Sequence, residues 1–140
     1  MPEPIISVSG LRGIVGESLS PEIAVRYAAA FVADLPPGSI VLTRDGRATG
    51  AMLADAVRSA LLASGRDVLD AGIAATPTTG VLVRHYHAAG GLQVSASHNP
   101  APYNGIKLFS GEGRVISATA GQAVIARYRA GDAHWAAHDK

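Results

Sequence analysis

The sequence has 140 residues, no cysteine, and 12 basic against 11 acidic side chains, for a net charge of +1. Its 48% hydrophobic and 16% charged residues predict one packed domain and argue against disorder. The lack of cysteine excludes disulfides, thiolate metal sites and a cysteine nucleophile. The balanced charge and the lack of a long apolar run disfavour nucleic acid and membrane partners. Because the first residues do not resemble a secretory signal, we expect a soluble, cytoplasmic protein.

The first predicted elements are a helix and a buried strand. Serine caps helix N-termini, proline suits the first helical position and an acid suits the first turn, so we expect a helix to begin at Ser20, Pro21 and Glu22. It should end before Pro36, because proline does not continue a helix. The short apolar run Ser39–Thr43 between turn signals predicts a buried strand.

A second helix, a strand and a third helix follow. An unbroken amphipathic pattern predicts the second helix, which Thr49 could cap and which Gly65 is placed to end. Asp67–Asp70 predicts a short strand. Thr76 and Pro77 repeat the pattern of a capping residue followed by proline, and they predict a third helix through His85.

The last third of the chain predicts two strands and one helix. Apolar and polar residues alternate over Leu92–Ala96 and again over Ile106–Phe109, which is typical of strands. A weaker helical pattern covers Ala118–Ala130. We therefore expect one domain over residues 1–130 and a tail, or a linker to further domains, over residues 131–140.

These elements predict an α/β fold, a three-layer α/β/α sandwich with a four-stranded mixed sheet whose last strand is antiparallel. The expected strand order across the sheet is 67–70, 39–43, 92–96 and 106–109. This order has a switch point between the second and third strands, and open α/β sheets bind ligands at the carboxyl ends of strands at such a point. Two loops, 44–50 and 97–105, should emerge there and form the site.

The second of these loops carries residues that could perform chemistry. Turn dipeptides at Asn99–Pro100 and Asn104–Gly105 would hold Ser97 at the end of its strand. The Ser97 hydroxyl, the His98 imidazole and the Lys107 ammonium could support phosphoryl or acyl transfer. A Ser-His pair is also common in turns as a backbone cap beside a solvated histidine, so the residues alone leave both interpretations open.

Four short strings resemble the α-D-phosphohexomutases, which include phosphoglucomutase, phosphomannomutase and phosphoglucosamine mutase. Their order and spacing agree, and together they span roughly residues 5 to 116. They are Ser9–Gly16 with Ser20–Glu22, Arg44–Arg47 with Gly50, Gly72–Ile73 with Thr76–Thr78, and Ser95–Pro100 with Tyr103–Lys107. The resemblance is to the N-terminal domain of four-domain enzymes, the domain that bears the phosphoserine.

The resemblance implies roles for particular residues. Ser97 would carry a phosphoryl group and exchange it with a hexose phosphate through a hexose bisphosphate, so that hexose 1-phosphate and hexose 6-phosphate interconvert. Lys107 would accept a proton or stabilise charge, and His98 would act as a polar positioning group beside it. Arg12 and Asn99 would bind substrate or phosphate, although Arg12 could equally brace the N-terminal arm. In contrast, we expect a further arginine, Arg47, to fix its turn without touching substrate.

The resemblance also implies Mg²⁺ in the full-length enzyme, held in part by the phosphate of Ser97. The remaining ligands belong to an Asp-Gly-Asp-Gly-Asp-like loop that this sequence lacks, so we expect no Mg²⁺ on this chain. In the family, the loops that recognise the sugar also lie in later domains, so we expect the chain alone to be inactive. Its expected partners are hexose phosphate, hexose bisphosphate and the remaining domains of the enzyme. The alternative is a free-standing, non-catalytic module that binds phosphate or a partner protein. A serine hydrolase is disfavoured because no G-x-S-x-G motif occurs.

Overall fold

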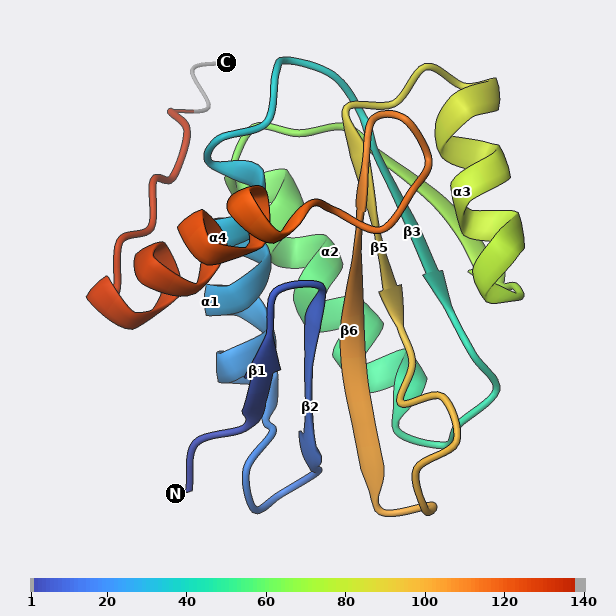
Figure 1. Ribbon diagram of the computed structural model, residues 1–140, viewed down its shortest axis with the longest axis vertical. Helices are drawn as coiled ribbons and strands as arrows, with labels where there is room; N and C mark the ends of the chain where they lie inside the picture. Colours follow the sequence, from blue (N-terminus) through green and yellow to red (C-terminus); the bar gives the residue numbers. More distant parts are fainter. Residues whose placement is uncertain (1, 138–140) are drawn as a thin grey trace.

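The computed structural model describes residues 2–137 as three layers, with one mixed sheet between two layers of helices (Figure 1). The strands are β1 (Ile5–Ser7), β2 (Gly10–Ile14), β3 (Ile40–Arg44), β4 (Val68–Ile73), β5 (Gly90–Val94) and β6 (Tyr103–Ser110). The helices are α1 (Pro21–Val32), α2 (Gly50–Ala63), α3 (Thr76–His85) and α4 (Ala118–Ala130). Helices α1, α2 and α4 lie on one side of the sheet and α3 lies on the other. The predicted sandwich is confirmed.

The sheet contains six strands in the order β1-β2-β6-β5-β3-β4. Strand β3 is parallel to both β4 and β5, whereas β5, β6, β2 and β1 pair antiparallel in succession. The predicted order of the four strands is therefore confirmed, with β4 at one edge. The predicted strand count is wrong, because the β1–β2 hairpin adds two strands outside β6. Strand β6 is consequently an inner strand and not an edge strand.

A capping side chain explains where α1 begins, but not where α2 and α3 begin. The Ser20 hydroxyl accepts a hydrogen bond from the backbone N–H of Ile23 at 3.3 Å, so α1 begins where predicted. Thr49 precedes α2 but does not cap it with its side chain, and Ala75, not Thr76, is the residue before α3. Both threonine hydroxyls instead bond to other side chains, Thr49 to Asn104 at 2.9 Å and Thr76 to Gln93 at 2.8 Å.

Several predicted strand boundaries are wrong. Strand β5 begins at Gly90 and ends at Val94, two residues earlier than expected. A side chain at Gly91 would lie 2.9 Å from the Val83 side chain, so glycine there lets α3 pack closely on β5. Asn104 and Gly105 are not a turn but part of β6, where Gly105 pairs with Arg12 of β2. Strand β4 is also longer than predicted, since it continues to Ile73.

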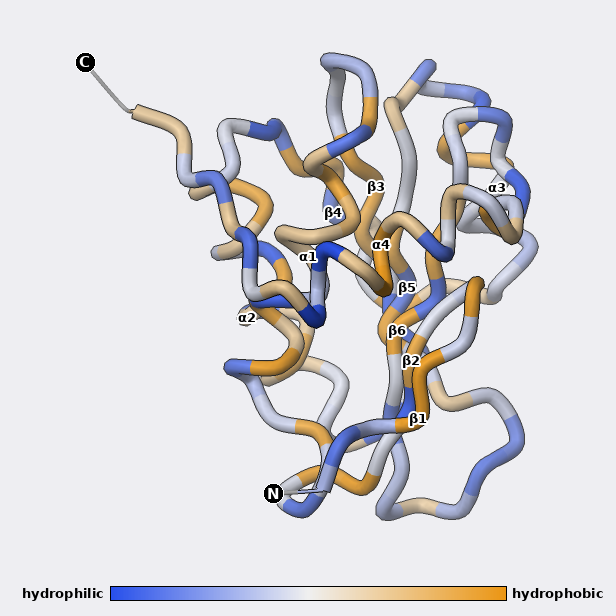
Figure 2. Tube along the Cα trace, turned by 60° about the vertical axis from the view of Figure 1, so that its left-hand side comes forward, coloured by the Kyte–Doolittle hydropathy of each residue, from blue (hydrophilic) through white to orange (hydrophobic). Residues whose placement is uncertain are grey.

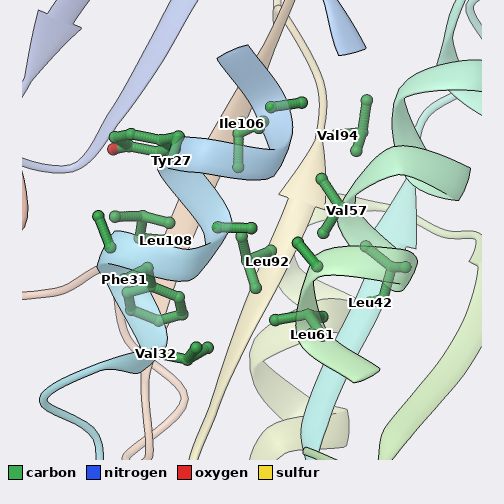
Figure 3. Packing of buried hydrophobic residues seen from close by; sticks show 14 of the residues in the cluster. Tyr27, Phe31, Val32, Leu42, Val57, Leu61, Leu92, Val94, Ile106 and Leu108 are labelled. Carbon is green, nitrogen blue, oxygen red and sulfur yellow. The ribbon is translucent and has the colours of Figure 1, made fainter. Parts of the chain in front are cut away.

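The main core lies between the sheet and helices α1 and α2. Figure 3 shows side chains of α1 and α2 pointing toward those of β3, β5 and β6. Figure 2 shows the hydrophobic residues gathered in the middle of the molecule and the hydrophilic ones in the connecting loops. Ile106 and Leu108 of β6 belong to this core, while Phe109 belongs to a smaller cluster under α3. Since side chains alternate along a strand, Lys107 projects from the α3 side of the sheet.

The segment after α4 follows the end of α2. Gly131, with a φ of 75°, ends α4, and the N–H of Ala136 donates to the carbonyl of Ala63 at 2.8 Å. Of the predicted tail over residues 131–140, residues 138–140 lie outside the described part of the chain. The predicted domain boundary at residue 130 stays a prediction. Within residues 2–137, no helix has the length and apolar character needed to cross a membrane.

Candidate active site

A cavity of about 180 Å³ opens on the α3 side of strands β1, β2 and β6, beside the loop that follows β5. Four of the five predicted site residues line it: Arg12, Ser97, Asn99 and Lys107. His98 is exposed and does not line it. The structure thus brings together residues that are up to 95 positions apart in the sequence, Arg12 being the first and Lys107 the last. The roles assigned to them stay predictions.

Strand pairing explains how the two cationic side chains reach one cavity. Gly10 lies opposite Lys107 and Arg12 lies opposite Gly105, whereas Leu11 lies opposite Ile106. Opposed residues of an antiparallel pair share one face of the sheet. Leu11 and Ile106 face the core, so Arg12 and Lys107 share the opposite face. Each of these long side chains has a glycine as its cross-strand neighbour.

Ser97 lies three residues beyond the end of β5 and has an unusual backbone conformation. Its φ is 56°, the left-handed region that residues with a β-carbon seldom adopt. Its N–H donates to the hydroxyl of Ser95 at 3.1 Å. The Asn99 amide donates to the Ala96 carbonyl at 2.7 Å and tightens the same turn. Ser97 itself is exposed, so its hydroxyl is accessible from solvent.

Arg47 connects the two loops that were expected to form the site. It lies in the turn after β3, where its Nε is 3.5 Å from the Asp45 carboxylate. The expectation that Arg47 helps to fix its own turn is confirmed. The side chain also extends to the loop after β5 and donates to four backbone carbonyls, which belong to Ser97, Asn99, Pro100 and Tyr103. Both loops are therefore at the same end of the sheet (Figure 1, bottom).

Sequence reasoning missed three serines that line the cavity, Ser7, Ser9 and Ser95. Ser7 and Ser9 come from the β1–β2 hairpin, which was not predicted as part of the sheet. The Ser7 hydroxyl donates to the Gly10 carbonyl at 3.2 Å and so helps to close that hairpin. Ser95 was placed in the string Ser95–Pro100 but given no role of its own, whereas the spacing of two serines around Ala96 could have indicated that its hydroxyl supports Ser97.

The cavity suits an anion. Among the described residues that line it, Arg12 and Lys107 are cationic and none is acidic. Arginine offers several N–H donors to phosphate oxygens and lysine offers a compact positive charge. The same composition does not fit Mg²⁺, which prefers carboxylate and other oxygen ligands. No group of three or more histidine, aspartate or glutamate side chains that could hold a metal ion occurs in residues 2–137.

Comparison with known proteins identifies the family. The family model described as phosphoglucomutase/phosphomannomutase, alpha/beta/alpha domain I, matches residues 4–135, and the chain belongs to this family. The chain is 46% identical over 105 residues to the "Probable phosphoglucosamine mutase" of Pyrococcus horikoshii, a match that covers 75% of this chain and 23% of that protein. It is 41% identical over 119 residues to the phosphoglucosamine mutase of Parasynechococcus marenigrum, covering 82% of this chain and 25% of that protein.

A solved structure supports the same assignment. The crystal structure of a candidate phosphomannomutase from Thermus thermophilus matches with a TM-score of 0.86 and 28% identity, over 95% of this chain and 31% of that one. The chain spans about a quarter of the length of the curated relatives it matches. It corresponds to the α/β/α domain I of much longer phosphohexomutases.

Proposed function

We propose that this chain is the phosphoryl-carrying domain of an enzyme that interconverts hexose 1-phosphate and hexose 6-phosphate, with Ser97 as the residue that is phosphorylated. The observation that carries this proposal is the position of Ser97, an exposed serine held in a left-handed conformation at a cavity that contains two cationic side chains. Membership of the phosphoglucomutase/phosphomannomutase family supports it.

In the proposed reaction, Ser97 Oγ forms a bond to phosphorus as the bond from phosphorus to the departing sugar oxygen breaks. In the reverse step a sugar hydroxyl attacks the phosphoserine, releases its proton and regenerates the Ser97 hydroxyl. Phosphoryl transfer depends chiefly on positioning and on neutralising the charge of the transferred group. Arg12 and a protonated Lys107 would stabilise that charge; in the alternative role, a neutral Lys107 would accept the proton that the attacking hydroxyl releases. Asn99 would bind a phosphate oxygen, and exposed His98 would be a polar positioning group.

Mg²⁺ would neutralise the charge of the transferred phosphoryl group in a complete enzyme, as it does in phosphoryl transfer generally. The residues around this cavity do not provide carboxylate ligands for it. Hexose phosphate, hexose bisphosphate and further domains of the same enzyme are the proposed partners. We propose that the chain alone does not turn over, because its cavity is open and presents no group that would enclose a hexose. The cytoplasmic location stays a prediction.

Phosphorylation of Ser97 can be tested on the chain itself by intact-mass measurement. As isolated, the chain should carry a free Ser97 hydroxyl. Prolonged incubation with excess glucose 1,6-bisphosphate and MgCl₂ should add one phosphate, which fragmentation should map to Ser97. The variant Ser97→Ala should remain unmodified, and Ser110→Ala, a control on the far end of β6, should be labelled like the parent chain. A phosphate mapped to Ser95, or equal labelling of Ser97→Ala, would contradict the proposed role.

The absence of turnover needs a separate measurement. Conversion of glucose 1-phosphate by the chain, with Mg²⁺ and a trace of the bisphosphate, should not exceed the blank. Measurable conversion that is lost in Ser97→Ala would show that the domain is self-sufficient. Saturable phosphate binding without any labelling of Ser97 would instead favour the non-catalytic, phosphate-binding module.

A further inference from the structure

Arg47 uses its whole guanidinium group to hold the loop that follows β5. One terminal nitrogen donates to the carbonyls of Pro100 at 2.8 Å and Tyr103 at 3.0 Å. The other donates to the carbonyls of Ser97 at 3.0 Å and Asn99 at 2.6 Å. The Nε–H is the fifth donor of an arginine, and it lies toward the Asp45 carboxylate at 3.5 Å. The loop therefore engages both terminal nitrogens of Arg47.

These contacts control the backbone on both sides of Ser97. The Ser95 hydroxyl accepts from the Ser97 N–H, and Arg47 donates to the Ser97 carbonyl. Because the N–H orientation depends on φ and the carbonyl orientation depends on ψ, the two bonds together fix both dihedral angles. Serine does not favour the observed φ of 56°, so the conformation persists only where surrounding bonds impose it.

Asp45 ties this arrangement to the sheet. Its carboxylate accepts a hydrogen bond from the backbone N–H of Arg47 at 3.1 Å. Its own backbone N–H donates to the carbonyl of Val94, the last residue of β5. Arg47 is therefore fixed relative to the strand end from which the loop departs. The Arg47 side chain as a whole is only 18% exposed, although its bonds to Ser97 and Pro100 lie at the surface.

We propose that Arg47 is a positioning residue that imposes the left-handed conformation of Ser97 and thereby directs its hydroxyl into the cavity. This inference rests on the proposed function of Ser97 for its catalytic meaning, but the conformational claim concerns the chain itself. Arg47 acts through the backbone of the loop and touches neither substrate nor the transferred group. Lysine could not replace it, because an ammonium group lacks the planar fork that serves four carbonyls at once.

Arg66 provides a matched control elsewhere in the molecule. It also donates to four backbone carbonyls, those of Val32, Leu35, Pro36 and Gly38, in the connection between α1 and β3. That connection lies at the opposite end of β3 from the turn that contains Arg47. The variants Arg47→Lys and Arg66→Lys therefore remove comparable hydrogen bonds from two unrelated loops.

The test combines NMR spectroscopy and amide hydrogen exchange on the 140-residue chain. A strong intraresidue NOE between the amide proton and Hα identifies a positive φ. This signal should be present at Ser97 in the parent chain and in Arg66→Lys, and absent in Arg47→Lys. Exchange of the hydrogen-bonded amides of Ser97, Asn99 and Tyr103 should be about tenfold faster or more in Arg47→Lys only, as expected for the loss of several hydrogen bonds. Retention of the left-handed signal in Arg47→Lys would overturn the proposal.

A thermodynamic cycle covers the case in which one variant is poorly folded. Glycine adopts a positive φ without strain, so Arg47→Lys releases no strain in a Ser97→Gly background. With serine at position 97, Arg47→Lys loses hydrogen bonds but also relieves the strain of the positive φ, so part of its cost is recovered. If Arg47 imposes the strain, Arg47→Lys should therefore lower the free energy of unfolding less with serine at position 97 than with glycine there. Equal destabilisation in both backgrounds would show that other contacts set the conformation, and would overturn the proposal.

The labelling experiment separates this proposal from the proposed function. Absence of labelling in the parent chain would count against the proposed function alone. Loss of the left-handed signal in Arg47→Lys would support the positioning claim even in that case. Where the parent chain is labelled, labelling of Ser97 should be at least about tenfold slower in Arg47→Lys and unchanged in Arg66→Lys. Equal rates in the parent chain and Arg47→Lys would overturn the positioning role while leaving Ser97 as the phosphorylated residue.

Discussion

Replacing Asn104 with alanine should destabilise the chain by about 3 kcal/mol, because this residue joins the first turn of α2 to the start of β6. Asn104 is fully buried. Its amide donates to the Thr49 hydroxyl at 2.9 Å, and its side-chain oxygen accepts from the N–H of Gly105 at 2.9 Å. The variant leaves the buried Gly105 N–H without a partner, at a cost of about 2 kcal/mol. Loss of the half-buried Thr49 bond adds about 1 kcal/mol.

The free energy of unfolding, measured by urea titration, checks this magnitude. The midpoint of thermal unfolding should fall by roughly 10 °C, as expected for about 3 kcal/mol in a domain of this size. The control is Asn99→Ala, which removes one half-buried hydrogen bond to Ala96 and should cost about 1 kcal/mol or less. In a double-mutant cycle, Thr49→Ala should cost less in the Asn104→Ala background than in the parent chain. An Asn104→Ala chain as stable as Asn99→Ala would refute the reasoning.

Two further predictions concern pH and a close backbone contact. Burial raises the pKa of the Tyr27 phenol above its ordinary value of 10.0, so the tyrosine favours folding below about pH 10 and this stability is lost as the pH rises further. Urea titrations from about pH 8 to about pH 11 should show a decline that Tyr27→Phe reduces, and an undiminished decline in that variant would contradict the assignment. A β-carbon at Gly10 would overlap the Ile106 carbonyl oxygen, so Gly10→Ala should separate β2 from β6 and destabilise the chain by roughly 3 kcal/mol. Gly46→Ala, where a β-carbon meets no atom within 4 Å, should change stability by less than about 1 kcal/mol in the same assay.

Local signals were sufficient where local interactions decide the structure. Ser20, which was predicted to cap the first helix, does so with its own hydroxyl. The order of the four predicted strands followed from the handedness of crossover connections, and it placed the two predicted loops at one end of the sheet, although only the loop after β5 lines the cavity. These features depend on short stretches of chain or on general topology, so the sequence predicts them well.

Long-range pairing explains what the sequence did not predict. Strand β1 has only three residues, although two of them are isoleucine, and β2 begins with Gly10 and contains Gly13, so neither forms a long run of strand-favouring residues. Strand β1 pairs only with β2, and the further partner of β2 is β6, almost a hundred residues later in the chain, where Lys107 lies opposite Gly10. The prediction of a turn at Asn104 and Gly105 was wrong for a related reason. The turn preference of Asn104 is local, but in β6 its side chain satisfies the backbone of Gly105 and the hydroxyl of Thr49.

The site itself divides into residues that face the cavity and residues that hold the loops from behind. Ser97, Arg12 and Lys107 face the cavity, and the resemblance of their sequence strings to phosphohexomutases is what indicated phosphate chemistry. Arg47 and Asn104 lie within those strings too, but they contact backbone atoms or a hydroxyl, so their residue types alone do not indicate these particular partners. The two sets should therefore respond differently to substitution. Removing a cation at the cavity should weaken the interaction with phosphate and leave the conformation of Ser97 unchanged. Removing Arg47 should change that conformation while every cavity cation remains, and this is why the arginine-to-lysine exchange, which conserves charge, is the decisive substitution at that position.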